Sequence, residues 1–225
     1  MKIEKYIDHT NLKMEATKED IAKLCEEARE YGFKTVCIHP FYVSYAKSLL
    51  KDSEVGVCTV IGFPLGMNTT DCKVYEAKEA VKNGADEIDM VINVGVLKDK
   101  AYDYVKEEII KIKECIYDKP LKVIVETSLL TEEELITMTK ICSEVKVNFI
   151  KTNTGFGKRG VIVCDVKTMN VHKSKELEIK ASGGIKTFEQ AQELIDAGAT
   201  RLGASSGVAI VNGANCSCQD CNCCK

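Results

Sequence analysis

The sequence predicts an α/β protein in which a single (β/α)8 barrel takes up most of the 225 residues. Eight short apolar runs, rich in β-branched residues, alternate with longer helix-like segments from one end of the chain to the other. They recur about every 28 residues, which is close to the spacing in a compact barrel. A doubly wound open sheet is the alternative, but no Gly-x-Gly-x-x-Gly motif follows the first run.

The first four strands and their helices are expected in the first half of the chain. Thr17, with Asp20 three residues on, signals the start of one helix, and Gly32 signals its end. Asn83 and Gly84 end another helix. The strands are expected over residues 6–10, 35–40, 56–64 and 87–93, and the helices over 17–32, 42–51, 70–83 and 98–117.

The second half continues the alternation with four more strands. Thr131 and the glutamates after it begin one helix, and Gly198 ends a later one. Polar residues follow the strands at their carboxyl ends, which converge on one mouth in a TIM barrel, where such enzymes have their active sites. The strands are expected over residues 121–127, 149–152, 178–182 and 201–205, and the helices from 131, over 163–174, over 187–197 and in a short terminal segment.

We expect one barrel domain over residues 1–211, with a short N-terminal strand and helix, because no Pro/Gly/Ser-rich linker divides the chain. Residues 212–225 form a Cys-rich tail that we expect to be flexible. Its thiols could bind Zn²⁺ or Cu⁺, but the tail has no histidine and no apolar face, which favours an appendage without a fixed role. These thiols belong to Cys216, Cys218, Cys221, Cys223 and Cys224.

The composition indicates a small-molecule partner and a cytoplasmic location. A net charge of −3 gives no electrostatic reason to expect nucleic acid. The N-terminus lacks the apolar region of a secretion signal, and no run of about 18 apolar residues predicts a membrane span. Seven of the 12 cysteines are scattered singly among apolar segments, as reduced core thiols are.

Two lysines interrupt runs that otherwise predict buried strands. Lys151 and Lys180 each have a strand parity that can direct the side chain into the barrel. Two ammonium groups about 4 Å apart repel by about 4 kcal/mol at an effective dielectric near 20, which would lower the pKa of one by about three units. Such an amine can form a Schiff base. Lysines that lie on an edge strand or snorkel to solvent are the structural alternative.

An acid and two glycine-rich turns complete the candidate site. Asp89 lies in the middle of a predicted buried strand and needs a cation, for which we expect Lys180. The pair is either an ordinary buried ion pair or a proton relay. Gly183 and Gly184 follow the seventh strand, and residues 203–207 follow the eighth. Barrels often bind phosphate at these two loops, although tight turns alone would also explain the glycines.

These residues lie in motifs that resemble those of the deoxyribose-phosphate aldolase family. The resemblance extends over about residues 5–211 and involves many motifs in the same order. The motifs are Tyr-Ile-Asp-His-Thr-Asn-Leu (6–12), Val-Cys-Ile-His-Pro (36–40), Val-Ile-Gly-Phe-Pro-Leu-Gly (60–66), Glu-Ile-Asp-Met-Val-Ile-Asn (87–93), Ile-Lys-Thr-Asn-Thr-Gly-Phe-Gly (150–157), Ile-Lys-Ala-Ser-Gly-Gly-Ile-Lys-Thr (179–187) and Arg-Leu-Gly-Ala-Ser-Ser-Gly-Val (201–208).

The resemblance implies a class I aldolase without metal or cofactor, which reversibly cleaves 2-deoxy-D-ribose 5-phosphate to D-glyceraldehyde 3-phosphate and acetaldehyde. It implies that Lys151 forms the Schiff base and that Asp89 and Lys180 move protons. It also implies a homodimer or homotetramer. The substrate- and phosphate-binding residues that it implies are Asp8, Cys37, Thr154, Gly183, Gly184, Gly203, Ser205 and Ser206.

Two features depart from the family pattern. Phe156 stands where some members have a lysine near the phosphate, which makes Lys158 and Arg159 alternative cations. Some members also end in a tyrosine that reaches the active site, whereas the last tyrosine here is Tyr117. Two other functions remain as alternatives. One is a sugar-phosphate isomerase or epimerase with Asp89 as the base, and the other is a metal-binding or thiol-buffering protein that works through its tail.

Overall fold

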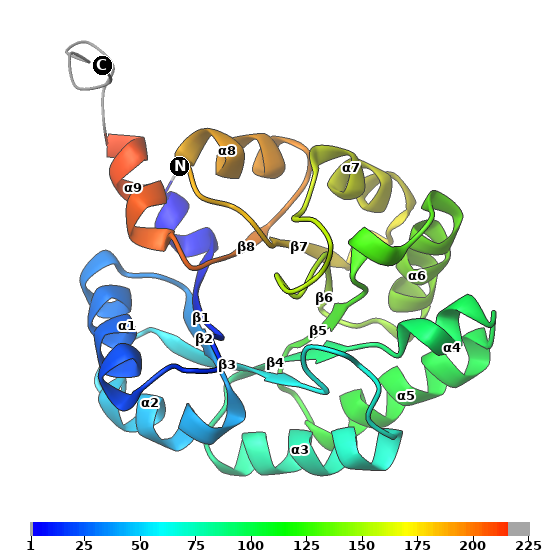
Figure 1. The fold of residues 1–225 in the computed structure, drawn as a ribbon, viewed down its shortest axis with the longest axis horizontal. Coiled ribbons are helices and arrows are strands. Elements are labelled where there is room, and N and C mark those ends of the chain that lie inside the picture. Colours follow the sequence, from blue (N-terminus) through cyan, green and yellow to red (C-terminus); the bar gives the residue numbers. More distant parts are fainter. Residues whose placement is uncertain (1, 216–225) are drawn as a thin grey trace.

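The computed structural model describes residues 2–215, in which eight parallel strands form a closed barrel (Figure 1). Each strand pairs with the next in the sequence, and β8 closes the barrel by pairing with β1. The prediction of a TIM barrel is confirmed. The strands are β1 (Ile7–Asn11), β2 (Thr35–Ile38), β3 (Gly56–Ile61), β4 (Glu87–Val91), β5 (Leu121–Ile124), β6 (Phe149–Lys151), β7 (Glu178–Ser182) and β8 (Arg201–Ala204).

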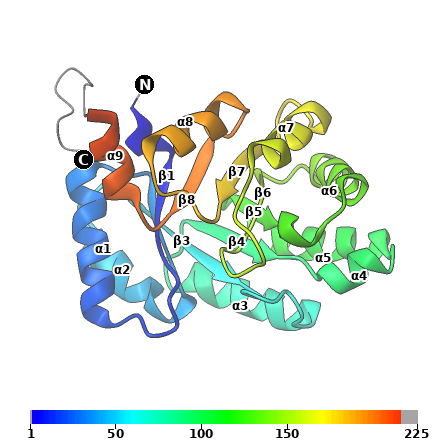
Figure 2. The ribbon, with the colours of Figure 1, turned by 45° about the horizontal axis from the view of Figure 1, so that its top comes forward.

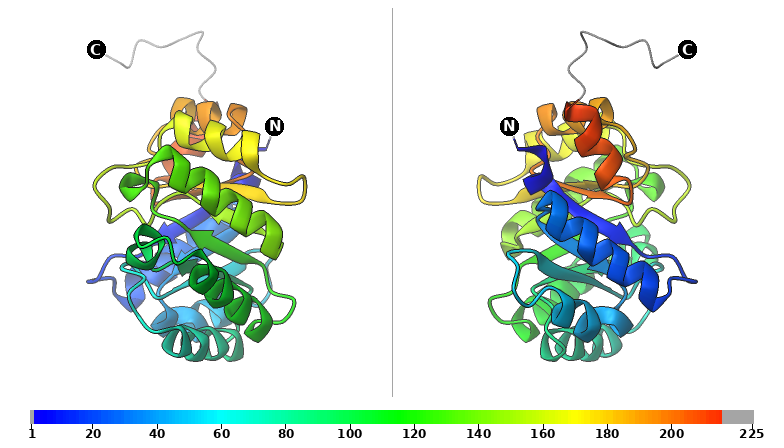
Figure 3. Two further views of the ribbon diagram at one scale, coloured as in Figure 1. Left: turned by 90° about the vertical axis from the view of Figure 1, so that its right-hand side faces the viewer. Right: turned by 90° about the vertical axis from the view of Figure 1, so that its left-hand side faces the viewer.

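Helices surround the barrel on the outside, as the tilted view and the two side views show (Figures 2 and 3). The α-helices are α1 (Lys18–Tyr31), α2 (Val43–Leu49), α3 (Thr70–Lys82), α4 (Val94–Lys98), α5 (Tyr102–Cys115), α6 (Glu132–Val145), α7 (Val163–His172), α8 (Phe188–Asp196) and α9 (Gly207–Asn215). The short 3-10 helices are η1 (Ile3–Tyr6), η2 (Pro40–Tyr42) and η3 (Thr127–Leu129). Among the described residues, no helix is both long enough and apolar enough to cross a bilayer.

The helix boundaries follow from local hydrogen bonds that the sequence signals. Thr17 accepts a hydrogen bond from the backbone N–H of Asp20, whose carboxylate accepts one from the N–H of Thr17 in return. Gly32 ends α1 with a φ of 67°, a conformation that glycine adopts without steric cost. Thr131 begins α6 through the same reciprocal arrangement with Glu134. The predicted starts of these two helices are confirmed.

The helix predicted over residues 98–117 is α5, which has narrower bounds. The prediction missed the short helix α4 before it, where the Asn93 side chain accepts a hydrogen bond from the N–H of Val96 at 3.2 Å. The chain turns between the helices, where Lys100 has a φ of 59°. Because Asn93 acts as this cap, β4 ends at Val91 rather than at residue 93.

The two faces of the barrel sheet differ sharply in polarity. The outward side chains, such as Ile88, Met90 and Val123, belong to the main apolar core between sheet and helices. The interior, which aliphatic side chains usually fill, contains seven charged residues instead. They are Asp8, Glu87, Asp89, Lys122, Lys151, Lys180 and Arg201.

The predicted boundary between barrel and tail lies inside α9, which continues to Asn215. The five tail cysteines, Cys216 to Cys224, lie outside the described residues, and the prediction of a flexible tail remains a prediction.

Candidate active site

The carboxylate of Asp89 brings three lysines together inside the barrel. Its Oδ2 accepts hydrogen bonds from Lys151 Nζ at 2.8 Å and from Lys180 Nζ at 2.7 Å. Its Oδ1 accepts one from Lys122 Nζ at 2.7 Å. Because Lys151 and Lys180 bind the same oxygen, their ammonium nitrogens lie no more than 5.5 Å apart. The structure thus places the two lysines and the aspartate that the sequence singled out in one cluster.

A second set of ion pairs lies against this cluster. Lys180 also pairs with Asp8, which in turn accepts a hydrogen bond from Arg201 at 2.8 Å. Glu87 pairs with Arg201 at 2.9 Å and with Lys122 at 2.6 Å. The result is one connected network of four cations and three carboxylates, which we call the interior network: Asp8, Glu87, Asp89, Lys122, Lys151, Lys180 and Arg201.

Sequence reasoning missed three members of the interior network, Lys122, Glu87 and Arg201. A signal for Lys122 was present, because it stands between Leu121 and Val123 in an apolar run, just as Lys151 and Lys180 do in theirs. Glu87 and Arg201 stand at the starts of their strands, where a polar residue is more often at the surface. Only closure of the barrel shows that they meet inside it.

The charges in the network fix the protonation of most of its members. Burial by itself lowers the pKa of Lys180, but the Asp8 and Asp89 carboxylates outweigh it and raise that pKa above its usual value. Burial likewise lowers the pKa of Lys122, but the Asp89 and Asp8 carboxylates raise it, and the net effect is an increase. The pKa of Asp89 is held well below its usual range because its lysine partners outweigh burial. Lys180 and Lys122 therefore remain ammonium groups at neutral pH, and Asp89 remains a carboxylate.

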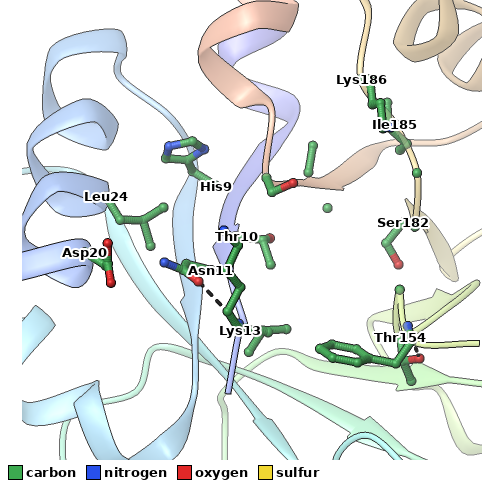
Figure 4. A pocket seen from close by; sticks show the side chains of 18 of the residues that line it. His9, Thr10, Asn11, Lys13, Asp20, Leu24, Thr154, Ser182, Ile185 and Lys186 are labelled. Atoms are coloured by element: carbon green, nitrogen blue, oxygen red, sulfur yellow. Dashed lines mark hydrogen bonds between the residues drawn. The ribbon is translucent and has the colours of Figure 1, made fainter. Parts of the chain in front are cut away.

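A cavity of about 410 Å³ opens at the carboxyl ends of β1, β6, β7 and β8, and we call it the reaction pocket (Figure 4). Lys151 is the only member of the interior network that lines it. Figure 4 shows Ser182, Ile185 and Lys186 on one side, with His9, Asp20 and Leu24 on the other. Of the remaining residues predicted from the resemblance, those that line the pocket are Thr154, Gly183, Gly184, Gly203 and Ser205.

Three predicted residues do not line the reaction pocket. Asp8 is fully buried and pairs with Lys180 and Arg201. Cys37 is also fully buried, and Ser206 lies at the start of α9, where its carbonyl oxygen accepts a hydrogen bond. Direct contact of these three residues with a substrate remains a prediction.

The glycine loops have the geometry that close backbone approach requires. Gly183 and Gly184 have φ values of 99° and 79°, which other residues rarely adopt. A Cβ on Gly160 would lie 2.5 Å from the carbonyl oxygen of Gly183, so the β6–α7 loop packs tightly on the β7 loop. After β8, Ser205 lines the same pocket, and α9 begins two residues later at Gly207. Backbone N–H groups at such loops and the positive end of a helix favour anions.

The cations at the pocket differ from those that the sequence suggested. Arg159 is held by Asp165 through two hydrogen bonds of 2.7 and 2.9 Å. Lys158 does not line the pocket, whereas Lys186 does, beside the Gly183–Gly184 turn. Lys186 stands in one of the quoted motifs, but its residue type and position gave no reason to choose it over other exposed lysines.

Two thiols lie at the base of the interior network. Cys37 and Cys58 face each other on β2 and β3, and the Cys58 thiol donates to Asp89 Oδ1 at 3.1 Å. The neighbouring Cys58 thiol and the charge of Lys180 lower the pKa of the Cys37 thiol to about 7, against the effect of burial. These thiols and Asp89 are close enough to share a metal ion, but ammonium groups already occupy both oxygens of the carboxylate. The expectation that no metal is needed stays a prediction.

Comparison with known proteins places the chain among aldolases. The family model described as DeoC/LacD family aldolase matches residues 2–213. The deoxyribose-phosphate aldolase of Dictyoglomus turgidum is 53% identical, over 92% of this chain and 94% of that protein. That of Staphylococcus carnosus is 54% identical, over 93% of this chain and 95% of that protein.

A solved structure of another aldolase has the same fold as this chain. The tetrameric deoxyribose phosphate aldolase from Aeropyrum pernix is 29% identical and superposes with a TM-score of 0.86, covering 95% of this chain and 91% of that one. The match to the family model extends over the whole barrel and includes the strands that carry Asp89, Lys151 and Lys180. The chain therefore belongs to the DeoC/LacD family of aldolases.

Proposed function

We propose that this chain is a class I deoxyribose-phosphate aldolase, which reversibly cleaves 2-deoxy-D-ribose 5-phosphate to D-glyceraldehyde 3-phosphate and acetaldehyde through a Schiff base on Lys151. The observation that carries the proposal is the position of Lys151, whose amine belongs to the interior network and also lines the reaction pocket. The relatives named above, at 53% and 54% identity, support the choice of substrate.

The interior network explains why Lys151 rather than Lys180 is the nucleophile in this proposal. Lys180 pairs with two carboxylates and Lys122 with three, whereas Lys151 pairs with Asp89 alone and shares that oxygen with Lys180. The network has four cations for three carboxylates, so loss of one proton from Lys151 leaves it balanced. The neutral amine then attacks the substrate aldehyde, and loss of water gives an iminium ion.

The iminium ion draws electrons from the neighbouring carbon–carbon bond. As the C2–C3 bond breaks, the proton of the C3 hydroxyl leaves, C3 becomes the aldehyde of glyceraldehyde 3-phosphate, and C1 and C2 become an enamine. A proton added at C2 and a water molecule added at C1 then release acetaldehyde. We assign the proton transfers to Asp89 and Lys180, because Asp89 Oδ2 contacts both Lys180 and Lys151.

The phosphate group is placed at the glycine loops in this proposal. Gly183, Gly184, Gly203 and Ser205 line the pocket with backbone or small side chains, and Lys186 adds a positive charge beside them. Thr154 already donates its hydroxyl hydrogen to Glu126 at 2.6 Å, so it contributes the shape of the pocket and its remaining hydroxyl lone pair.

Lys186→Ala should weaken substrate binding more than it slows the chemical steps. We expect KM for the phosphorylated substrate to rise about tenfold and kcat to change less than about threefold, because one charge-assisted contact is lost away from the reacting bond. Steady-state kinetics on 2-deoxy-D-ribose 5-phosphate measure both. Lys167→Ala on α7, an exposed lysine that does not line the pocket, is the matched control. An unchanged KM would remove Lys186 from the phosphate site.

Reductive trapping tests the covalent mechanism directly. With acetaldehyde and borohydride, the imine on Lys151 should be reduced to a stable ethyl-lysine, which peptide mass spectrometry locates. An unmodified Lys151 in a protein that retains its activity would contradict the Schiff base and favour isomerisation or epimerisation with Asp89 as a base.

We also propose one barrel domain over residues 1–211, a cytoplasmic location and a homodimer or homotetramer. Free thiols at the seven cysteines of the described part support a reducing compartment. The A. pernix relative, described as tetrameric, and exposed apolar side chains such as Met14 and Phe41 support self-association. Light scattering after size-exclusion chromatography would determine the oligomeric state, and a monomer would contradict the proposed self-association.

A further inference from the structure

A second cavity, of about 450 Å³, lies at the mouth of the barrel next to the reaction pocket, and we call it the side cavity. It opens over the ends of β3, β4 and β5, and its walls are largely apolar. Val91, the next inward residue after Asp89 on β4, forms part of it. Residues that line it include Leu65, Met67, Val91, Leu129, Thr154 and Phe156.

Two residues, Thr154 and Phe156, line both cavities. Both belong to the loop that follows β6, and Figure 1 shows this yellow-green segment reaching across the mouth of the barrel. The Phe156 ring meets the Phe63 ring edge to face, with centroids 5.5 Å apart and an interplanar angle of 86°. The Phe156 side chain therefore lies between the reaction pocket and the side cavity, and it packs against Phe63, which follows β3.

The buried carboxylate of Glu126 fixes this loop in place. It accepts hydrogen bonds from the N–H and the hydroxyl of Thr154, at 3.0 and 2.6 Å, and from the amide of Asn153 at 2.9 Å. The N–H of Phe156 bonds to the Thr154 hydroxyl at 3.0 Å. A Cβ on Gly157 would lie 2.3 Å from Glu126 Oε1, so backbone and carboxylate are in close contact.

The charge on Glu126 is consistent with this role. Burial raises the pKa of Glu126, but the hydrogen bonds from Thr154, Ser128 and Asn153 outweigh burial and hold that pKa below its usual value. The carboxylate therefore remains charged and its hydrogen bonds remain strong at neutral pH. Because these hydrogen bonds hold the loop backbone in place, backbone movement does not help the Phe156 ring to rotate away from its position.

We propose that Phe156 determines which carbonyl compounds can condense with Lys151, by closing the reaction pocket toward the apolar side cavity. The inference rests on the proposed Schiff-base function and names its substrate class, short aldehydes such as acetaldehyde. In the condensation, the Lys151 amine adds to the carbonyl carbon and the oxygen leaves as water. An alkyl chain on that carbon needs space beyond Lys151. The side cavity offers such space, but the Phe156 side chain blocks the path to it.

Phe156→Ala should join the two cavities and admit longer unbranched aldehydes. The experiment incubates the full-length protein with equal amounts of acetaldehyde and hexanal, traps the imines with borohydride, and counts ethyl and hexyl adducts on Lys151 by peptide mass spectrometry. We expect the hexyl-to-ethyl ratio to rise about tenfold to a hundredfold over that of the unchanged protein, since each methylene removed from water favours binding about fourfold. Phe41→Ala, an exposed phenylalanine that lines neither cavity, should leave the ratio unchanged.

A second variant shows where the chain of hexanal lies. Leu65 is 73% exposed at the side cavity, so Leu65→Glu is tolerated by the fold but places a charge against the alkyl chain. In the Phe156→Ala background it should return the hexyl-to-ethyl ratio to within about threefold of the unchanged protein, with ethyl trapping intact.

The outcomes separate this inference from the proposed function. If the unchanged protein forms no ethyl adduct, the Schiff-base function fails. If it forms the ethyl adduct but already accepts hexanal as readily as Phe156→Ala does, or if Phe156→Ala gains nothing while circular dichroism shows it folded, Phe156 is not the determinant. If Leu65→Glu does not lower the raised hexyl-to-ethyl ratio of Phe156→Ala, the assignment of the alkyl chain to the side cavity is also overturned.

Discussion

Lys151→Ala should reduce the cleavage of 2-deoxy-D-ribose 5-phosphate by at least about 10⁴-fold, because no other amine of the interior network lines the reaction pocket. The fold should persist. Asp89 Oδ2 keeps its hydrogen bond from Lys180 at 2.7 Å, so the substitution leaves no unpaired charge in the barrel. Aldehyde release measured with a coupled assay gives the turnover, and thermal melting checks the fold.

A matched control uses a lysine of the same loop. Lys158→Ala removes an exposed ammonium group that does not line the pocket, and its turnover should stay within about twofold of the unchanged protein. Trapping with acetaldehyde should yield no adduct in Lys151→Ala and a normal adduct in Lys158→Ala. Turnover by folded Lys151→Ala above about 1% would assign the covalent step to another residue.

Lys180→Leu should lower kcat by about 10³-fold and move the rise of its pH profile upward by about two units. The two ammonium nitrogens lie no more than 5.5 Å apart, so at an effective dielectric near 20 they repel by at least about 3 kcal/mol. Without the Lys180 charge, three cations face three carboxylates, and the charge repulsion that favours the neutral nucleophile is lost. The proton-transfer partner of Asp89 is also lost.

Lys180→Gln separates the effect of charge from that of packing. It keeps a polar side chain near Asp8 and Asp89 but carries no charge, so its rate and pH profile should resemble those of Lys180→Leu. Both variants leave Asp8 with Arg201 and Asp89 with Lys122, which favours folding. A pH–rate profile for a folded variant that matches the unchanged protein in position and height would refute the role of charge repulsion.

The periodicity of the chain was enough to predict most of the fold. Alternating β-branched runs gave the eight strands, and caps such as Thr17 and Thr131 gave the starts of helices, because these signals act within a few residues. The short helix α4 was missed because a helix of this length, capped by Asn93, is hard to distinguish from the end of a strand. In the site, Lys151, Lys180 and Asp89 stood out because a charge inside an apolar run is unusual.

What the sequence by itself determined is the order of strands and helices and the presence of two lysines and an aspartate on inward positions of the sheet. Only the tertiary structure decided which charges meet. Asp89 reaches Lys151 and Lys180 across the barrel from strands that are not its neighbours, and Glu87 meets Arg201 in the same way. Closure of the sheet also placed Lys186 at the pocket and Phe156 between two cavities, whereas the pairing of Arg159 with Asp165 is local. Local patterns fix the direction of a side chain, but the distance between strands far apart in sequence is set by how the whole barrel packs.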